Sequence, residues 1–281
     1  MRAPFPLSPP GERVAERSEV GRGAGRSVSF GLSPLPLRGS PSPLKGRGKE
    51  VLLALTLLAA CDGAKPLLKH ETRQPGPFPA ADRPVASIVS PRWSTEEARD
   101  KANEAGAVMD RAGLKHGMTV ADIGAGEGYY TIRLAARVGK TGRVLAEDII
   151  PATRDTLAQR VARERLDNVS VRLGAPADPR LPPASFDRVL MIHMYHEIEQ
   201  PYEFLWRLRP ALKPDGLVVM VDADRPTDQH GTPPALLQCE LAAVGYAQVS
   251  RQDMPSAGGY LATFRAEGLR PEPKQIKACR A

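Results

Sequence analysis

The sequence predicts an α/β fold built on a doubly wound, mostly parallel sheet of seven strands that ends in an antiparallel hairpin. From about residue 94, short apolar runs of strand length alternate with longer segments that have helical periodicity. Such alternation produces a parallel sheet with helices on both faces. The last two strand patterns have no helix between them, so we expect these strands to pair antiparallel.

The first predicted element is a helix from Ser94 to about Gly113, because Ser94 and Glu97 have the spacing of a capping box. A continuous apolar run at 217–221 is typical of a strand buried on both faces. The predicted strands are 118–124, 142–149, 168–174, 185–194, 217–224, 246–253 and 259–266. The predicted helices between them are 129–137, 152–166, 201–212 and 233–245.

The N-terminal part has a different composition. Residues 1–50 are rich in Pro, Gly, Ser and Arg and have no regular period, so we expect them to be disordered or to precede the true translation start. Residues 45–61 combine a basic stretch, a largely apolar run of ten residues and Cys61. A run of ten residues is too short to span a membrane, and the pattern is typical of a secretory signal.

The segment Leu58-Ala59-Ala60-Cys61 resembles the lipobox of bacterial lipoprotein signals. The resemblance implies that Cys61 is acylated and anchors the protein on the periplasmic side of a bacterial membrane. The alternative is a buried helix in a cytoplasmic protein. The Pro-rich residues 62–91 then predict a tether, followed by a folded domain at 92–267 and a C-terminal tail at 268–281.

Charge and cysteine content restrict the function classes. The net charge is +7, but residues 1–61 hold nine Lys or Arg and four Glu, so the remaining chain carries only +2. A near-neutral domain without a basic stripe argues against nucleic-acid binding. Cys239 lies among leucines in a predicted helix, which favours core packing, although an exported domain also allows a disulfide with Cys279.

A glycine-rich turn, residues 122–128, lies where the first predicted strand becomes a helix. Ligands of open α/β sheets bind at this carboxyl edge, and glycines permit a sharp turn and close approach. A dinucleotide site needs a small residue where this chain has Tyr129. Asp148 closes the second predicted strand, and its two oxygens suit a vicinal diol.

The string VADIGAGEGYYT (120–131) is similar to motif I of class I S-adenosylmethionine-dependent methyltransferases. The resemblance covers about residues 92–266 and implies a Rossmann-like fold with S-adenosylmethionine as cofactor. It implies that Asp148 accepts hydrogen bonds from both ribose hydroxyls, or Glu147 if the register shifts, and that Ile149 lies under the adenine. The residues implied to hold the methionyl end are Asp122, Gly124, Ala125, Gly126 and Gly128.

Two further strings are similar to a group of bacterial predicted methyltransferases. GAPADPRLPPASFD (174–187) implies that Asp178 contacts the adenine, with a turn-capping role as the alternative. The string YHE follows the fourth predicted strand, at the edge where an acceptor would react. A base is needed if the acceptor keeps its proton, so His196 or Glu197 is expected to act as base and Tyr195 to orient the acceptor.

Other polar residues near this edge are weaker candidates. His193 falls inside a predicted strand, which favours a core position, and we predict no metal site from His193, His196 and Glu197. Arg92 and Trp93 precede the first helix and are candidates for a lid. The candidates for acceptor contact in the loop after the fifth strand are Asp222, Asp224 and His230.

The sequence therefore predicts an enzyme that transfers a methyl group from S-adenosylmethionine to a small molecule. An exported domain is separated from the cytoplasmic methyl donor, so a binding or sensor protein without catalysis is the second interpretation. An NAD-linked oxidoreductase is the third. The only expected membrane link is the lipid anchor on Cys61, and the sequence makes no prediction of oligomeric state.

Overall fold

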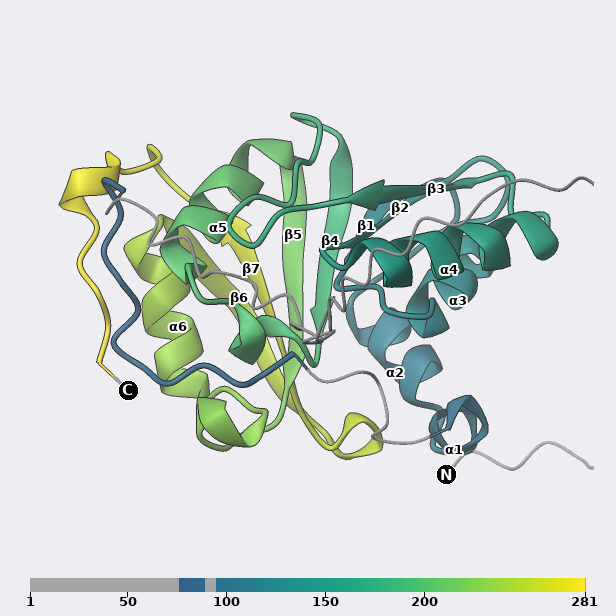
Figure 1. Ribbon diagram of the computed structural model, residues 1–281, viewed down its shortest axis with the longest axis horizontal. Helices are drawn as coiled ribbons and strands as arrows, with labels where there is room; N and C mark the ends of the chain where they lie inside the picture. The colour runs from purple at the N-terminus through teal and green to yellow at the C-terminus, as the bar shows by residue number, and fades with distance from the viewer. Residues whose placement is uncertain (1–75, 89–94, 281) are drawn as a thin grey trace, which may run out of the picture. The chain divides into compact units, whose positions relative to one another are not determined.

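The computed structural model describes residues 76–88 and 95–280 (Figure 1). The predicted signal at 45–61 and the lid candidates Arg92 and Trp93 lie outside the described residues. None of the described helices is both long and apolar enough to cross a membrane.

Seven strands form one sheet in the order β3-β2-β1-β4-β5-β7-β6. Strands β1 to β5 are parallel, and β7 runs antiparallel to both β5 and β6. The predicted fold class, including the C-terminal antiparallel hairpin, is confirmed. The strands are β1 (Thr119–Ile123), β2 (Arg143–Asp148), β3 (Val169–Leu173), β4 (Phe186–Ile192), β5 (Leu212–Asp222), β6 (Tyr246–Met254) and β7 (Gly259–Ala266).

The prediction of one helix from Ser94 to Gly113 is wrong, because two short helices occupy this region. Asn103 adopts a left-handed conformation between them, which asparagine tolerates better than most residues. The first helix is capped by the side chain of Thr95. The helices are α1 (Glu96–Lys101), α2 (Glu104–Arg111), α3 (Tyr129–Val138), α4 (Pro151–Arg163), α5 (Pro201–Leu208) and α6 (Pro234–Ala243).

The sheet is buried on both faces. In β5, Val218 and Met220 pack into the core shared with α5 and α6, whereas Val219 and Val221 pack into the core shared with α2 and α3. Figure 1 shows these two helix pairs on opposite sides of the sheet. The continuous apolar run of β5 is therefore explained, as predicted, by burial on both faces. The carboxyl ends of the parallel strands meet at one edge of the sheet.

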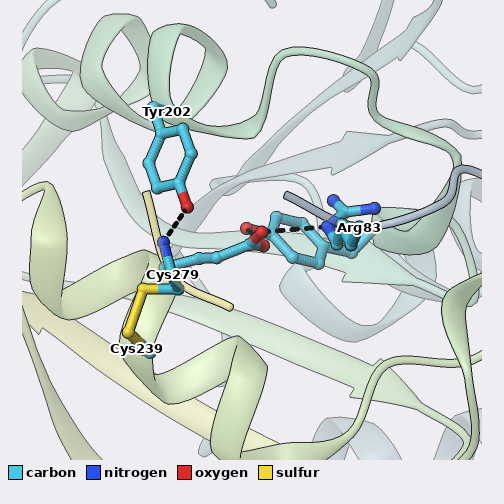
Figure 2. Close-up of a disulfide and its surroundings, with 6 residues drawn as sticks. Arg83, Tyr202, Cys239 and Cys279 are labelled. Atoms are coloured by element: carbon cyan, nitrogen blue, oxygen red, sulfur yellow. Dashed lines mark hydrogen bonds and ion pairs between the residues drawn. A yellow bond between two sulfur atoms is a disulfide. The ribbon is translucent and has the colours of Figure 1, made fainter. Parts of the chain in front are cut away.

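Residues 76–88, which we call the N-terminal strap, pack on the domain although the sequence predicted a tether there. Asp82 forms a parallel bridge with Arg280, and the backbone N–H of Ala86 donates to the carbonyl of His196. Arg83 forms a buried ion pair with Glu240 of α6 (Figure 2). The tether prediction is wrong for these residues. It was based on their high proline content, which gives no sign of the few side chains that are buried.

The C-terminal residues are likewise part of the fold. Cys279 forms a disulfide with Cys239 of α6, and its backbone N–H donates to the Tyr202 hydroxyl at 2.7 Å (Figure 2). The sequence left two roles open for Cys239, core packing or a disulfide with Cys279, and the structure contains the disulfide. This bond fixes the tail against α5 and α6.

Candidate functional site

A cavity of about 1850 Å³ opens at the carboxyl ends of β1, β2, β4 and β5. Pockets for a single small ligand usually measure about 300–1000 Å³, so this cavity has room for two ligands side by side. The predicted glycine turn and Asp148 lie at one part of its lining, and His193 and His196 lie at another.

The glycines of the turn adopt left-handed backbone conformations, which residues with a side chain rarely adopt. Gly124, Gly126 and Gly128 have φ values of 66°, 56° and 93°. A Cβ on Gly128 would lie 2.5 Å from Cδ1 of Leu157 in α4. The turn therefore requires glycine, and it exposes the backbone between β1 and α3 to the cavity.

Three carboxyl groups surround this turn: Asp122, Glu147 and Asp148, all of which line the cavity. Burial raises the pKa of Asp122 to about 6, although the Thr131 hydroxyl donates to it at 2.6 Å. Burial and the neighbouring Asp148 raise the pKa of Glu147 to about 8. The group is thus a buried acidic site whose carboxyl groups would be stabilised as anions by a cation.

Asp148 is 7% exposed and faces the cavity. Its two oxygens accept hydrogen bonds from the backbone N–H groups of Gly126, at 3.0 Å, and Ile150, at 2.8 Å. Each carboxylate oxygen has a second lone pair for another donor. The ribose contact of Asp148 stays a prediction, as does the adenine contact of Ile149, which also lines the cavity.

Tyr129, at the position where a dinucleotide site has a third small residue, lines the cavity. Its ring contacts two guanidinium groups, 3.7 Å from Arg99 and 3.8 Å from Arg133. Its hydroxyl donates to Asp100 of α1. Tyr129 therefore fixes α1 against α3 beside the cavity. This role was not predicted from the sequence, although a bulky residue directly after the glycine turn could have indicated it.

At the other part of the cavity, His196 is 1% exposed. Its Nδ1 lies 3.0 and 3.1 Å from the two carboxylate oxygens of Asp222. Because a carboxylate only accepts, Nδ1 carries the proton, and Nε2 presents a lone pair in the neutral ring. Asp222 also accepts from the Thr232 hydroxyl at 2.7 Å and from the backbone N–H of Ala223. Asp222, a candidate for acceptor contact, lies outside the cavity lining and orients His196.

Two predictions near this edge are corrected by the structure, and the role of Glu197 as base stays a prediction. Tyr195 was expected to orient an acceptor, but it is 1% exposed, lies outside the cavity lining and donates to Glu240 at 2.6 Å. His193 was expected in the core, but it follows β4 with φ 55° and lines the cavity, where burial lowers its pKa. Glu197 lines the cavity as expected.

The remaining candidates divide between cavity and surface. Asp178 lines the cavity, and it also caps its own turn by accepting from the backbone N–H of Arg180 at 2.8 Å. His230 lines the cavity, with its ring 5.4 Å from that of His196. Asp224 is exposed and lies outside the cavity lining.

Comparisons of the sequence with known proteins find methyltransferases. A family model described as a methyltransferase domain matches residues 120–216. Nocamycin O-methyltransferase from Saccharothrix syringae is 41% identical over 83 residues, which are 29% of each chain. The ubiquinone/menaquinone biosynthesis C-methyltransferase of Salmonella paratyphi B is 25% identical over 180 residues, 59% of this chain and 65% of that one. This chain thus spans less than two thirds of these relatives.

Solved structures share the fold at low identity. A SAM-dependent methyltransferase from Aquifex aeolicus superposes with a TM-score of 0.52 and 23% identity, over 61% of this chain and 97% of that chain. The [4+2]-cyclase SpnF superposes with a TM-score of 0.53 and 17% identity, over 68% of this chain and 89% of that chain. These likenesses show the fold alone.

The chain has the α/β Rossmann-like methyltransferase fold. Within it, the segment 120–216 matches the family model described as a methyltransferase domain. This segment contains the glycine turn, Asp148 and the η1 turn Tyr195–Glu197.

Proposed function

We propose that the protein binds S-adenosylmethionine and transfers its methyl group to a small organic acceptor. One observation carries the proposal: a single cavity is lined by the acidic glycine turn and by His196. The bound donor would supply a methyl group on a sulfonium, which the nucleophilic atom of the acceptor takes while the sulfur keeps the electron pair of the broken bond.

The charge of the donor site supports S-adenosylmethionine over a dinucleotide. Asp122, Glu147 and Asp148 converge on the glycine turn, and one oxygen of Glu147 is buried without a hydrogen-bond partner among the described residues. A sulfonium and an ammonium group would be attracted to these carboxyl groups. The pyrophosphate of NAD would be repelled by them. We therefore assign the glycine turn and Asp148 to S-adenosylmethionine.

The acceptor would lie next to His196. The Asp222 carboxylate holds the ring with Nε2 available, and the lone pair on Nε2 favours the deprotonated form of an acceptor group placed there. Glu197 lines the same part of the cavity. The names of the matched relatives, which refer to nocamycin and to ubiquinone/menaquinone biosynthesis, support a small organic acceptor.

Asp148→Ala tests the donor site. Loss of the carboxylate is expected to weaken S-adenosylmethionine binding by about 1–3 kcal/mol, because ribose hydroxyls would be left unpaired. Isothermal titration calorimetry measures this, with NAD and the demethylated product as comparison ligands. Asp224→Ala removes an exposed acid outside the cavity and should leave the dissociation constant unchanged. An unchanged constant in Asp148→Ala, or tighter binding of NAD, would contradict the assignment.

Transfer itself is tested separately from binding. The full-length chain is incubated with methyl-labelled donor and a pool of small metabolites, and labelled products are separated by chromatography. Labelled product supports the enzyme. Tight donor binding without any labelled product would favour the binding or sensor protein instead.

We also propose that the domain is exported and anchored through Cys61. The lipobox-like sequence supports this, as does the Cys239–Cys279 disulfide, because disulfides persist mainly in oxidising compartments. Cys61→Ser is expected to move the protein from the membrane fraction to the soluble fraction when cells are fractionated. Equal membrane association of Cys61→Ser and wild type would refute the anchor.

A further inference from the structure

We infer that His196, Glu197 and His230 bind a divalent first-row transition-metal ion beside the proposed acceptor position. One ligand atom from each of the three residues lies within 4.8 Å of the other two. All three residues line the cavity. Ion binding stands independently of the proposed function, whereas a role of the ion in holding the acceptor rests on it.

His196 provides the strongest indication of a ligand. Its Nε2 is buried and has no hydrogen-bond partner among the described residues. A buried polar atom left unpaired destabilises the fold, so a partner for this atom is expected. Meanwhile, Asp222 holds Nδ1 at 3.0 Å. Histidines that bind metal ions typically donate their second ring N–H to a carboxylate in this way, which orients the ring and strengthens the ligand.

The loop that carries His230 is fixed by the same carboxylate. Thr232 donates to Asp222 at 2.7 Å, two residues after His230. The guanidinium of Arg225 donates to the His230 carbonyl at 3.0 and 3.1 Å. The two imidazole rings meet edge to face with their centroids 5.4 Å apart. Asp222 therefore positions two of the three candidate ligands at once.

The ligand set selects the class of ion. Two imidazoles and one carboxylate suit zinc, iron, cobalt or nickel, whereas magnesium and calcium prefer oxygen ligands. Ligand atoms around one ion at bond lengths of about 2.1 Å lie at most about 4.2 Å apart. Binding would therefore draw the three side chains together by a few tenths of an ångström. The open coordination position would face the cavity, where an acceptor oxygen or nitrogen can bind and lose its proton more readily. With the ion on Nε2, the ion and not the Nε2 lone pair would then favour the deprotonated acceptor.

From the sequence, the ligand set considered was His193, His196 and Glu197, and no metal site was predicted because no further Cys/His cluster supports one. In the structure, the Nε2 of His193 lies 3.8 Å from a carboxylate oxygen of Glu104. His193 is therefore separated from this group. The correct set joins residues 34 positions apart, which no local spacing reveals.

The test is calorimetric titration of Zn²⁺ into the full-length chain, stripped of metal with a chelator and purified through a tag without histidines. The visible absorption of bound Co²⁺ reports the coordination directly. We expect about one ion per chain in the wild type. His230→Ala and Glu197→Gln should each lose stoichiometric binding. Asp222→Asn should retain it with about 10–100-fold weaker affinity. His116→Ala, which removes an exposed histidine outside the cavity, should bind as the wild type does.

Two results would overturn the inference: absence of stoichiometric Zn²⁺ binding in the wild type, or equal binding in wild type, His230→Ala and Glu197→Gln. Donor affinity is measured in parallel with S-adenosylmethionine, to which all variants should bind normally. Normal donor binding and methyl transfer by metal-free wild type would leave the proposed function intact while refuting a role of the ion in holding the acceptor.

Discussion

His196→Ala is expected to lower the rate of methyl transfer by about 10²–10⁴-fold while leaving the affinity for S-adenosylmethionine unchanged. The reason is position: His196 lies at the end of the cavity with the Asp222 carboxylate behind it, and the donor contacts are assigned to the glycine turn and Asp148. Single-turnover kinetics with labelled donor and calorimetry measure the two quantities separately.

Two comparisons show whether His196 acts on the acceptor or only supports the fold. Asp222→Asn removes the charge that orients the ring, so transfer should fall although the imidazole remains. His116→Ala should leave transfer unaffected. A parallel loss of transfer and donor affinity in His196→Ala, together with a lower melting temperature, would indicate a structural role and sink the assignment.

Arg83→Met is expected to lower the free energy of unfolding by about 3–5 kcal/mol. The Arg83 and Glu240 side chains are both 0% exposed, and Arg83 Nε donates to Glu240 Oε1 at 2.9 Å. Methionine keeps much of the apolar stem but leaves the Glu240 carboxylate buried without its cation. Glu240 also accepts from Tyr195, so the loss should loosen the turn that carries His196. Denaturant unfolding monitored by circular dichroism measures the change.

A double-mutant cycle separates the ion pair from general packing. Arg83→Met combined with Glu240→Gln removes both charges, so the double variant should be more stable than Arg83→Met alone. Arg265→Met is the control, because its pair with Glu267 is exposed and such pairs contribute under about 1 kcal/mol. Additive effects of the two single changes would show that the buried charges do not stabilise one another.

The donor side of the site could be predicted because its signals are local. The glycines at 124, 126 and 128 directly follow a strand pattern, and Asp148 ends the next one. In a parallel sheet, the carboxyl ends of neighbouring strands meet at one edge. Motifs that end two successive strands in the sequence therefore lie close together in the fold.

The acceptor side depends on contacts between distant residues. Asp222 reaches His196 across 26 positions, and Tyr195 reaches Glu240 across 45. Within a 3-10 turn there is no period from which to tell that Tyr195 points to the core while its neighbour His196 lines the cavity. The buried position of Arg83 could not be predicted for another reason. The residue lies in a Pro-rich segment, and composition does not reveal a single buried cation.

The bridge between Asp82 and Arg280 sets an order of events during folding. This bridge can close only after the chain has been synthesised through residue 280, although the strap itself is made first. The other strap contacts do not wait for the tail, because Arg83 pairs with Glu240 and Ala86 donates to the His196 carbonyl. The bridge between strap and tail is therefore among the last contacts of the domain to form.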